Sequence, residues 1–369
     1  MQIISMQIIL IHDDEKRYFE SLVKLEEEGE IKIFPYHVHF IKTFLKGLLR
    51  KKVNLSILAF KTFIFFIRSF FIKDKIILIG IAPYDPAILL WQHLTKRNKV
   101  IYHTSWPYWD FEQGSIKPLI FKRLIFKNWK NFIESENTFI VAVLNPIKNE
   151  ILRKFRKEEE KIFVIPHSVD LEIFKSTNKT KKEKVGVLFV GRLVYEKGLE
   201  DLKKIILHFK NSKEIFFGIV GDGKDKNIVK NTFELENVKY YGYLNDKKKL
   251  SEIMNEYDIF LLPSFKTEKW EELFGISIIE AMAKGLVPIV TDCIGPRHIV
   301  EDGINGFVVK QRDVEKMIEQ LKSLKENEKL YFSLRINAIK DSEKYNLEKI
   351  QEEWKHLIFN KISARRKVK

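Results

Sequence analysis

The sequence predicts an α/β protein of two domains, each built on a doubly wound parallel sheet. Two observations carry this prediction. The chain has 369 residues, which exceeds the roughly 250–300 at which a single hydrophobic core stops growing. Short apolar runs that read as strands alternate with helical stretches, an order that produces parallel sheets covered by helices on both faces. The polar stretch STNKTKKEK at 176–184 interrupts this alternation, which then begins again.

The domain boundaries follow from that interruption. We expect a first domain over 1–168, a second over 169–345, and a C-terminal helix with a basic tail over 346–369 that packs back toward the first domain. The clearest helix of the first half is YDPAILLWQHLTKRN, where Asp85 is placed to cap a helix that begins at Pro86. The expected strands are the apolar runs MQIIL, EIKIFPYHV, KIILIGIAP, KVIYHTSW and FIVAVL, then KVGVLFVGRL, EIFFGIVGDG, NVKYYGYL, YDIFLLPS, VPIVTD and GFVV.

The composition is that of a globular protein in a reducing compartment. Hydrophobic residues make up 45% and charged residues 31% of the chain, which suits a packed core. The single cysteine, Cys293, excludes an intramolecular disulfide and a cysteine-based zinc site. The N-terminus lacks a basic region and reads as a strand rather than a signal peptide, with Met6 an alternative start. Without an apolar run of roughly 18 residues, we expect a cytoplasmic protein.

The formal net charge of +15 indicates either an anionic partner or a proteome that is generally rich in lysine. Nucleic acid is the first hypothesis, but no helix-turn-helix, zinc-finger or RNP-like motif is visible, so we expect no nucleic acid. The position of the charge is more informative. Between residues 39 and 75 the only acid is Asp74, against the cations Lys42, Lys46, Arg50, Lys51, Lys52, Lys61, Arg68, Lys73 and Lys75.

The motif GRLVYEKG at 191–198 follows the expected strand VGVLFV directly. Its first glycine, Gly191, allows a tight turn at the carboxyl end of a strand, where doubly wound sheets bind ligands. Arg192 and Lys197 then present two cations suited to a diphosphate, Arg as a planar fork and Lys as a point charge. By itself the motif is more typical of a strand-turn-helix with solvated cations.

A second glycine turn, IVGDG, places Gly221 and Gly223 after the next strand. It is a weak signal alone, because Gly-Asp-Gly turns are common. In EELFGISIIEAMAKG at 271–285, Gly275 near a helix start leaves the backbone amides of Phe274, Gly275 and Ile276 available to an anion. Glu272 lies in the preceding loop and Glu280 two turns into the helix, so two carboxylates are placed to hold hydroxyl groups; surface glutamates of an amphipathic helix are the alternative.

Taken together, these motifs, with NVKYYGYLND between them and IVEDGINGFVV after them, resemble the C-terminal domain of the family 4 retaining glycosyltransferases. The match covers about 130 residues, and the joint pattern is specific. The resemblance implies the GT-B architecture, in which two Rossmann-like domains face each other across a cleft. It also implies that Arg192 and Lys197 bind the donor diphosphate, Glu272 the transferred sugar and Glu280 the ribose. Tyr243 and Leu244, just after the Gly-Tyr element, fall near the base.

The first half resembles the acceptor domain of the same family more loosely. VIYHTSWPYW places His103 at a strand end, where family members carry a histidine that faces the donor sugar; a core histidine packed by Trp106, Tyr108 and Trp109 is the alternative. Many members have a Gly-Gly loop after the first strand. This chain reads IHDDEKRYF there, so we carry over no amide contact to phosphate from that loop.

The resemblance implies a retaining transfer of a hexose from a nucleotide diphosphate sugar, with GDP-mannose the first choice and a UDP-sugar the alternative. The acceptor is expected to be a glycan or a polyprenyl-lipid-linked sugar. A catalytically silent GT-B subunit that only binds is the rival class. No D-x-D occurs in the sequence, so we expect neither a metal nor another cofactor, and the cations must stabilise the leaving diphosphate.

The stretch 39–75 is also rich in phenylalanine. An apolar stripe that includes Phe60, Phe63, Ile67 and Phe70 has helical spacing, with Phe65 and Phe66 outside it. A helix that is apolar nearly all round is either buried or in contact with lipid. With cations beside it, peripheral contact with an anionic membrane, on the inner face, is one hypothesis; a buried helix with a basic rim is the other.

Overall fold

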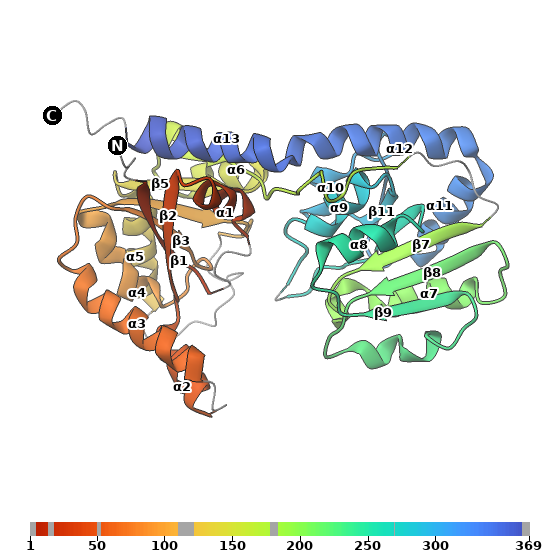
Figure 1. Cartoon of the computed structure of the whole chain (residues 1–369), viewed down its shortest axis with the longest axis horizontal. Coiled ribbons are helices and arrows are strands. Elements are labelled where there is room, and N and C mark those ends of the chain that lie inside the picture. The colour runs from red at the N-terminus through yellow and green to blue at the C-terminus, as the bar shows by residue number, and fades with distance from the viewer. Residues whose placement is uncertain are drawn as a thin grey trace. The chain divides into compact units, whose positions relative to one another are not determined.

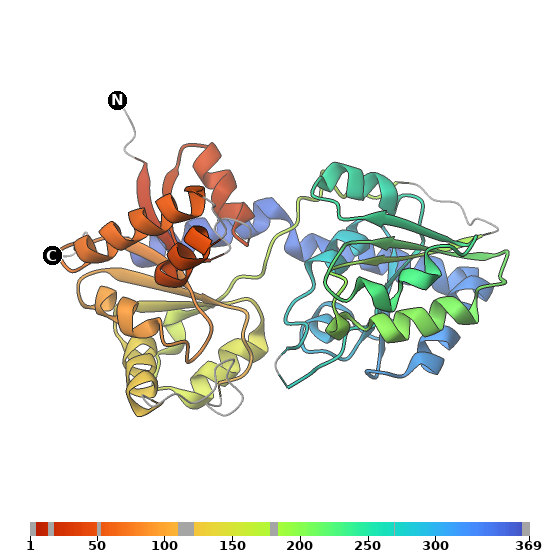
Figure 2. The ribbon, with the colours of Figure 1, turned by 90° about the horizontal axis from the view of Figure 1, so that it is seen from below.

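The computed structural model describes residues 5–13, 18–49, 53–109, 122–177, 184–268 and 270–363. The chain divides into two compact units. The first comprises Met1–Ser168 together with Leu347–Lys369, and the second comprises Val169–Asn346. Helices pack on both sides of the sheet in each unit (Figures 1 and 2).

The described part of the first unit contains a six-stranded parallel sheet of order β2-β1-β3-β4-β5-β6. The five apolar runs expected as strands in the first half all form strands of this sheet, because helices on both faces bury their apolar side chains. Their bounds are β1 Met6–Ile11, β2 Ile31–Tyr36, β3 Ile76–Gly80, β4 Lys99–Thr104, β5 Thr138–Ala142 and β6 Ile162–Val164.

The helices of the first unit connect these strands in turn. They are α1 Glu20–Glu27, α2 Phe40–Leu49, α3 Val53–Ser69, α4 Ile88–Trp91, η1 Gln92–Lys96, α5 Lys122–Glu134, α6 Asn145–Lys154 and η2 Glu159–Lys161. The expected helix over 84–98 is shorter than its pattern suggests. Asp85 accepts a hydrogen bond from Ala87 N at 2.8 Å, but α4 begins only at Ile88, so Pro86 precedes the helix rather than opening it.

The second unit repeats the architecture with strand order β12-β11-β10-β7-β8-β9, again parallel. Its strands are β7 Val185–Val190, β8 Ile215–Val220, β9 Val238–Gly242, β10 Ile259–Leu262, β11 Val287–Thr291 and β12 Phe307–Val309. The connecting helices are η3 Tyr195–Lys197, α7 Leu199–His208, η4 Lys226–Ile228, η5 Lys230–Thr232, α8 Lys247–Met254, α9 Ile276–Ala283, α10 Pro296–Ile299, α11 Val314–Glu326, α12 Glu328–Ser342 and η6 Glu343–Tyr345.

The end of the chain belongs to the core of the first unit. Helix α13 (Leu347–Lys355) lies beside α1 (Figure 1) and continues as a π-helix, η7 (His356–Ile362). Ile350, Trp354 and Leu357 are buried against side chains of the first sheet, including Ile8 and Leu10. The first unit therefore closes its core with residues that follow the whole second unit in sequence.

The phenylalanine-rich stretch forms two helices, α2 and α3, and not one. Phe65 is buried, contrary to the expectation that it would be exposed on a helix in contact with lipid, because its ring stacks on Tyr36 at 4.0 Å and 15° and also on Trp91. The stripe that contains Phe60 and Phe63 faces outward instead. Arg50, Lys51 and Lys52 lie outside the described residues, as does the basic tail 365–369. No helix among the residues that the structure describes is long and apolar enough to cross a membrane.

Candidate functional site

Loops that carry the sequence motifs meet at the carboxyl edge of the second sheet. From β7 the chain order runs to β8 and β9 on one side and, after a crossover, from β10 to β11 and β12 on the other. The switch therefore falls between β7 and β10. Doubly wound sheets bind ligands at this point, because the two adjacent loops leave the sheet in opposite directions. The loops 191–198 and 263–275 follow these two strands.

Glycines bring the loop after β8 against the loop after β7. A Cβ on Gly221, whose φ is 139°, would lie 1.9 Å from Gly191 O, and a Cβ on Gly223 would lie 2.3 Å from Leu193 O. Backbone bonds join the same segments, since Gly191 N donates to Val220 O at 3.0 Å and Leu193 N to Asp222 O at 3.0 Å. Gly221 and Gly223 thus shape this edge of the site by close backbone packing.

Lys197 and Glu272 form an ion pair across the switch point. Both side chains are largely buried, and Lys197 Nζ also lies 5.5 Å from the centre of the Trp270 ring. The turn that presents Lys197 is held close to β10, because a Cβ on Gly198 would lie 1.9 Å from Pro263 O. The cation predicted for the diphosphate and the carboxylate predicted for the sugar are therefore in direct contact.

Arg192 differs from Lys197 in its surroundings. Its side chain is exposed, and among the described residues its guanidinium has no hydrogen-bond or ion-pair partner. Its backbone is fixed, because Val194 N donates to Arg192 O at 2.9 Å. The planar guanidinium has five N–H donors and is attached to a fixed backbone, so it can bind a phosphate that arrives from solvent.

The loop before α9 is tied to the loop after β11. Gly295 N donates to Glu272 O at 2.9 Å, and Ile294 N donates to the carboxylate of Glu271 at 2.7 Å. Burial raises the pKa of Glu271, an effect that the Ile294 N–H bond opposes. Glu271 was not singled out in the sequence; it anchors the segment from which its neighbour Glu272 reaches Lys197.

Helix α9 begins at this loop with Gly275 as its N-cap, at φ 111°. Phe274 is buried edge-to-face against Tyr345 at 5.9 Å, and Ile276 is half-buried at the first helical position. Glu280 is buried within the helix. The start of α9 and the pair Lys197–Glu272 thus belong to one loop system.

The residues expected at the base lie farther along the sheet. Tyr243 is exposed directly after β9, and its hydroxyl donates to Asn245 Oδ1 at 3.4 Å; Leu244 is half-buried. Since β9 is the edge strand of the sheet beyond β8, neither residue contacts the Lys197–Glu272 pair in this structure. The two residues mark one end of the carboxyl edge.

Residues 170–341 match the profile of the family described as glycosyl transferases group 1. The chain therefore carries a glycosyl transferases group 1 domain. This domain contains the predicted residues Arg192, Lys197, Glu272 and Glu280 and the loops that hold them.

Curated relatives agree with the family. A diphospho-undecaprenol N-acetylgalactosaminyltransferase of Campylobacter jejuni (full name N,N'-diacetylbacillosaminyl-diphospho-undecaprenol alpha-1,3-N-acetylgalactosaminyltransferase) is 29% identical over 218 residues, 55% of each chain. The UDP-Gal:alpha-D-GlcNAc-diphosphoundecaprenol alpha-1,3-galactosyltransferase of Escherichia coli is 30% identical over 217 residues, 54% of each chain. The matched region thus spans about half the length of these relatives.

A solved structure extends the likeness to the whole chain. Sucrose-phosphate synthase from Thermosynechococcus elongatus has a TM-score of 0.73 at 16% identity, and the match covers 98% of this chain and 100% of that one. At this identity the comparison establishes the fold alone. The predicted fold class, two doubly wound parallel sheets of the GT-B type, is confirmed.

His103, predicted to face the donor sugar, lies in the unit that precedes the glycosyl transferase domain. It is the penultimate residue of β4 and is buried among aromatic rings, with the ring centres of Phe19 at 4.9 Å, His167 at 5.5 Å and Trp354 at 6.3 Å. Burial, with the nearby His167 and His12, holds the pKa of His103 well below its ordinary value, so the ring is neutral at neutral pH. These surroundings are those of the alternative, a packed core histidine. The observed neighbours differ from the Trp106, Tyr108 and Trp109 that the sequence suggested.

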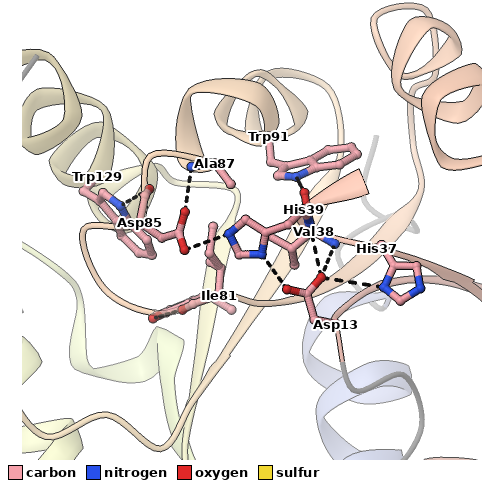
Figure 3. A network of polar contacts seen from close by, with 10 residues as sticks. Asp13, His37, Val38, His39, Ile81, Asp85, Ala87, Trp91 and Trp129 are labelled. Atoms are coloured by element: carbon pink, nitrogen blue, oxygen red, sulfur yellow. Dashed lines mark hydrogen bonds and ion pairs between the residues drawn. The ribbon is translucent and has the colours of Figure 1, made fainter. Parts of the chain in front are cut away.

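A polar network lies at the carboxyl edge of the first sheet (Figure 3). His39 Nδ1 lies 2.5 Å from Asp13 Oδ2, and His39 Nε2 lies 2.9 Å from Asp85 Oδ2. Ionised carboxylates only accept hydrogen bonds, so both ring nitrogens must donate and the ring must carry a proton on each. These bonds, first that to Asp13, raise the pKa of His39 to about 10.

Asp13 is the more highly connected carboxylate of this network. It also accepts from Val38 N at 3.0 Å and His39 N at 3.2 Å, and His37 Nδ1 lies 3.7 Å away. Burial by itself raises the pKa of Asp13, but the neighbouring His37 and the bonds from His39 outweigh it and hold the pKa well below its usual range. Asp13 and His39 are therefore both ionised at neutral pH.

This network was not predicted from the sequence, although a signal for it exists. Asp13, His39 and Asp85 follow β1, β2 and β3, three adjacent strands of the sheet, and the chain order reverses between β1 and β3. Polar residues after successive parallel strands come together at one sheet edge. Asp85 was interpreted only as a helix cap; its second carboxylate oxygen accepts a hydrogen bond from Ala87 N, but Ala87 itself precedes α4.

Within the described ranges, no three or more His, Cys, Asp or Glu side chains are arranged so that they could hold a metal ion. The candidate site consequently consists of the Lys197–Glu272 pair, exposed Arg192, and the start of α9. Its charge balance combines two cations with one carboxylate, which suits an anionic ligand that also presents hydroxyl groups.

Proposed function

We propose that this protein is a glycosyltransferase that uses a nucleotide diphosphate sugar. The observation that carries the proposal is the Lys197–Glu272 pair at the switch point of a glycosyl transferases group 1 domain. Arg192 and Lys197 would neutralise the leaving diphosphate, and the amides at the start of α9 would add partial positive charge. Glu272, once Lys197 turns to the phosphate, is free to accept a hydrogen bond from a sugar hydroxyl.

The nucleotide is proposed to be a uridine diphosphate rather than the GDP first expected. The names of two relatives state a UDP-sugar donor: the Escherichia coli galactosyltransferase above and an N-acetylglucosaminyltransferase subunit of Streptococcus pneumoniae. The sugar itself and the retaining course of the reaction rest on the family resemblance. A thermal-shift screen with UDP, GDP and ADP separates the bases, since a ligand at about 100 times its Kd adds about 2.7 kcal/mol of stability.

The acceptor is proposed to be a sugar carried on a polyprenyl diphosphate lipid. Two of the relatives are named for diphospho-undecaprenol acceptors. Such an acceptor requires the enzyme to work at a membrane surface, and residues 39–75 are our candidate for peripheral contact. The Asp13–His39–Asp85 network, at the carboxyl edge of the first sheet, is our candidate for acceptor contact because it presents ionised groups where such sheets bind ligands.

Donor hydrolysis by the purified protein tests the proposal. We expect release of UDP from at least one UDP-sugar, and a decrease of about 10²-fold in kcat for Arg192→Ala. Because Arg192 is exposed and has no described partner, this variant should keep the melting temperature of the wild type. No hydrolysis or binding of any nucleotide sugar by a folded wild type would favour the rival class, a catalytically silent subunit.

A further inference from the structure

Helix α3 buries two hydroxyl side chains while it exposes several apolar ones. Thr62 and Ser69, which face the rest of the first unit together with Phe65, are 0% and 2% exposed, while the outward Phe60 is 56% exposed. A surface helix of a soluble protein normally has the opposite arrangement, with its apolar stripe toward the core. This inversion needs a physical reason.

The contacts of the inward side fix the rotation of the helix. Thr62 Oγ1 accepts a hydrogen bond from His37 N at 3.3 Å, and Ser69 Oγ lies 2.7 Å from His93 Nε2. Phe65, from the same side, is held between Tyr36 and Trp91. A rotation that buried Phe60 would expose Phe65 and break its ring contacts, so the outward stripe is a stable feature of the fold.

Helices α2 and α3 pack against each other, and exposed apolar side chains lie on both helices and at the two positions after α3. More than half of the exposed large apolar side chains among the described residues belong to this stripe. Soluble monomers rarely present so many together unless the patch binds something. Its members are Ile41, Phe44, Leu45, Leu49, Ile57, Phe60, Phe63, Ile64, Ile67, Phe70 and Phe71.

Cations lie on the same helices and just after them. Lys42, Lys61, Arg68, Lys73 and Lys75 are all exposed. Asp74 is the only acid between residues 39 and 75. Phenylalanine and leucine side chains beside clustered lysine and arginine are typical of helices that lie in the interface of an anionic bilayer.

We propose that the outward face of α2 and α3, defined by the stripe and the five cations above, docks on an anionic phospholipid surface. The apolar side chains would enter the boundary between head groups and acyl chains, and the cations would contact lipid phosphates. The inference deepens the proposed function, because a lipid-linked acceptor lies in such a surface. Helix α2 begins at Phe40, directly after His39, so the docking face starts beside the network that is our candidate for acceptor contact.

A second copy of this chain is the competing occupant, and charge argues against it. In a twofold dimer the same patch meets itself, which would bring two sets of five cations together with only Asp74 of each chain to balance them. An anionic bilayer offers the complementary charge to every cation at once. The charge of the face therefore favours lipid.

Co-sedimentation with vesicles tests the proposal without any donor, so it can fail independently of the transfer reaction. The wild type should bind vesicles of phosphatidylcholine and phosphatidylglycerol in equal parts, bind less at high salt, and bind weakly to phosphatidylcholine alone. Phe60→Ser/Ile67→Ser should lose this binding and keep its melting temperature, since both side chains are exposed. Leu89→Ser/Leu124→Ser, two exposed apolar residues of the same unit, is the matched control and should bind as the wild type does.

A second pair of variants tests the contribution of the cations to vesicle binding. Lys61→Glu/Arg68→Glu should weaken binding to the anionic vesicles by more than tenfold, because each cation near the surface contributes a factor of about five. Lys210→Glu/Lys213→Glu changes the net charge equally, with exposed residues of the second unit, and should bind as the wild type. The proposal is overturned if the wild type does not bind anionic vesicles, or if Phe60→Ser/Ile67→Ser converts a dimeric wild type into a monomer and leaves vesicle binding unchanged.

Discussion

Lys197 and Glu272 act as one unit in this structure, and their variants should behave as one. Removal of Lys197 leaves a largely buried carboxylate without its partner, a change that typically costs more than the loss of a surface pair. We expect Lys197→Ala and Glu272→Gln each to lower kcat by about 10²-fold or more. The double variant should lose little more than the worse single variant, because residues in direct contact are not additive.

A surface ion pair supplies the control for this cycle. Lys316 and Glu319 lie 2.7 Å apart with both side chains exposed, so Lys316→Ala should leave kcat and the melting temperature unchanged. Steady-state donor hydrolysis gives kcat for the wild type and for all four variants. Full additivity of the Lys197 and Glu272 variants would show that the two residues work independently.

His39 should make the stability of the protein depend on pH above neutrality. Its pKa is raised from 6.5 to about 10, so its contribution to stability is complete below pH 6.5 and is lost as pH rises toward 10. We expect His39→Gln to lower the free energy of unfolding by about 1–3 kcal/mol at neutral pH. The variant should also flatten the decline in melting temperature between these two pH values.

An exposed histidine serves as the comparison for this experiment. His208 lies exposed near the end of α7, and His208→Gln should keep the pH profile of the wild type. The stability contribution of Asp13 has the opposite pH dependence. Its pKa is depressed, so this contribution is present above pH 3.8 and is lost in acid. A His39→Gln profile that parallels the wild type up to pH 10 would contradict the charged network.

At the scale of elements, the loops after β7 and β8 lie so close together that a glycine between them should not tolerate replacement by alanine. Gly221→Ala would place its Cβ 1.9 Å from Gly191 O, so the loop that carries Arg192 must move. We expect a loss of about 3 kcal/mol or more in the free energy of unfolding, together with weaker binding of the nucleotide.

Gly303 separates steric overlap from backbone strain. It has φ 71° but nothing within 4 Å of its Cβ position. Gly303→Ala should therefore cost only about 1–2 kcal/mol for the left-handed conformation and leave nucleotide binding intact. Thermal unfolding and calorimetric titration measure both variants; equal losses of stability would rule out the overlap as the cause.

At the scale of the molecule, the first unit should depend on the far end of the chain. Trp354 is buried against Phe19 at 6.4 Å and against His103. Trp354→Ala is expected to cost about 3–5 kcal/mol and to speed amide exchange in β1 and α1 rather than in the second unit. Lys349→Ala, at an exposed position of α13, should change neither quantity.

Catalysis should not require a divalent metal. The proposal assigns the neutralisation of the diphosphate to Arg192, Lys197 and the start of α9, because the sequence contains no D-x-D. Donor hydrolysis in excess EDTA should therefore match hydrolysis in its absence. Complete loss of activity that Mg²⁺ or Mn²⁺ restores would assign that charge to a metal instead.

The sequence by itself determined the two parallel sheets and the position of the loops that carry Arg192, Lys197 and Glu272. Strand runs such as VGVLFV are short, apolar and flanked by turn residues, so their conformation follows from local chemistry. Arg192 lies two residues after β7, Glu272 lies in the loop between β10 and α9, and the carboxyl ends of these parallel strands meet at one edge of the sheet. Local pattern and topology rules were enough to bring them together.

Only the tertiary structure decided which faces are buried and which polar residues meet. Phe65 and Phe60 are equally apolar in the sequence, and the rings of Tyr36 and Trp91 decide that the first is buried. His39 acquires its charge only where Asp13 and Asp85 converge from separate loops, and His103 is enclosed partly by Trp354, about 250 residues farther along the chain. These outcomes depend on contacts between residues distant in sequence, which no local pattern contains.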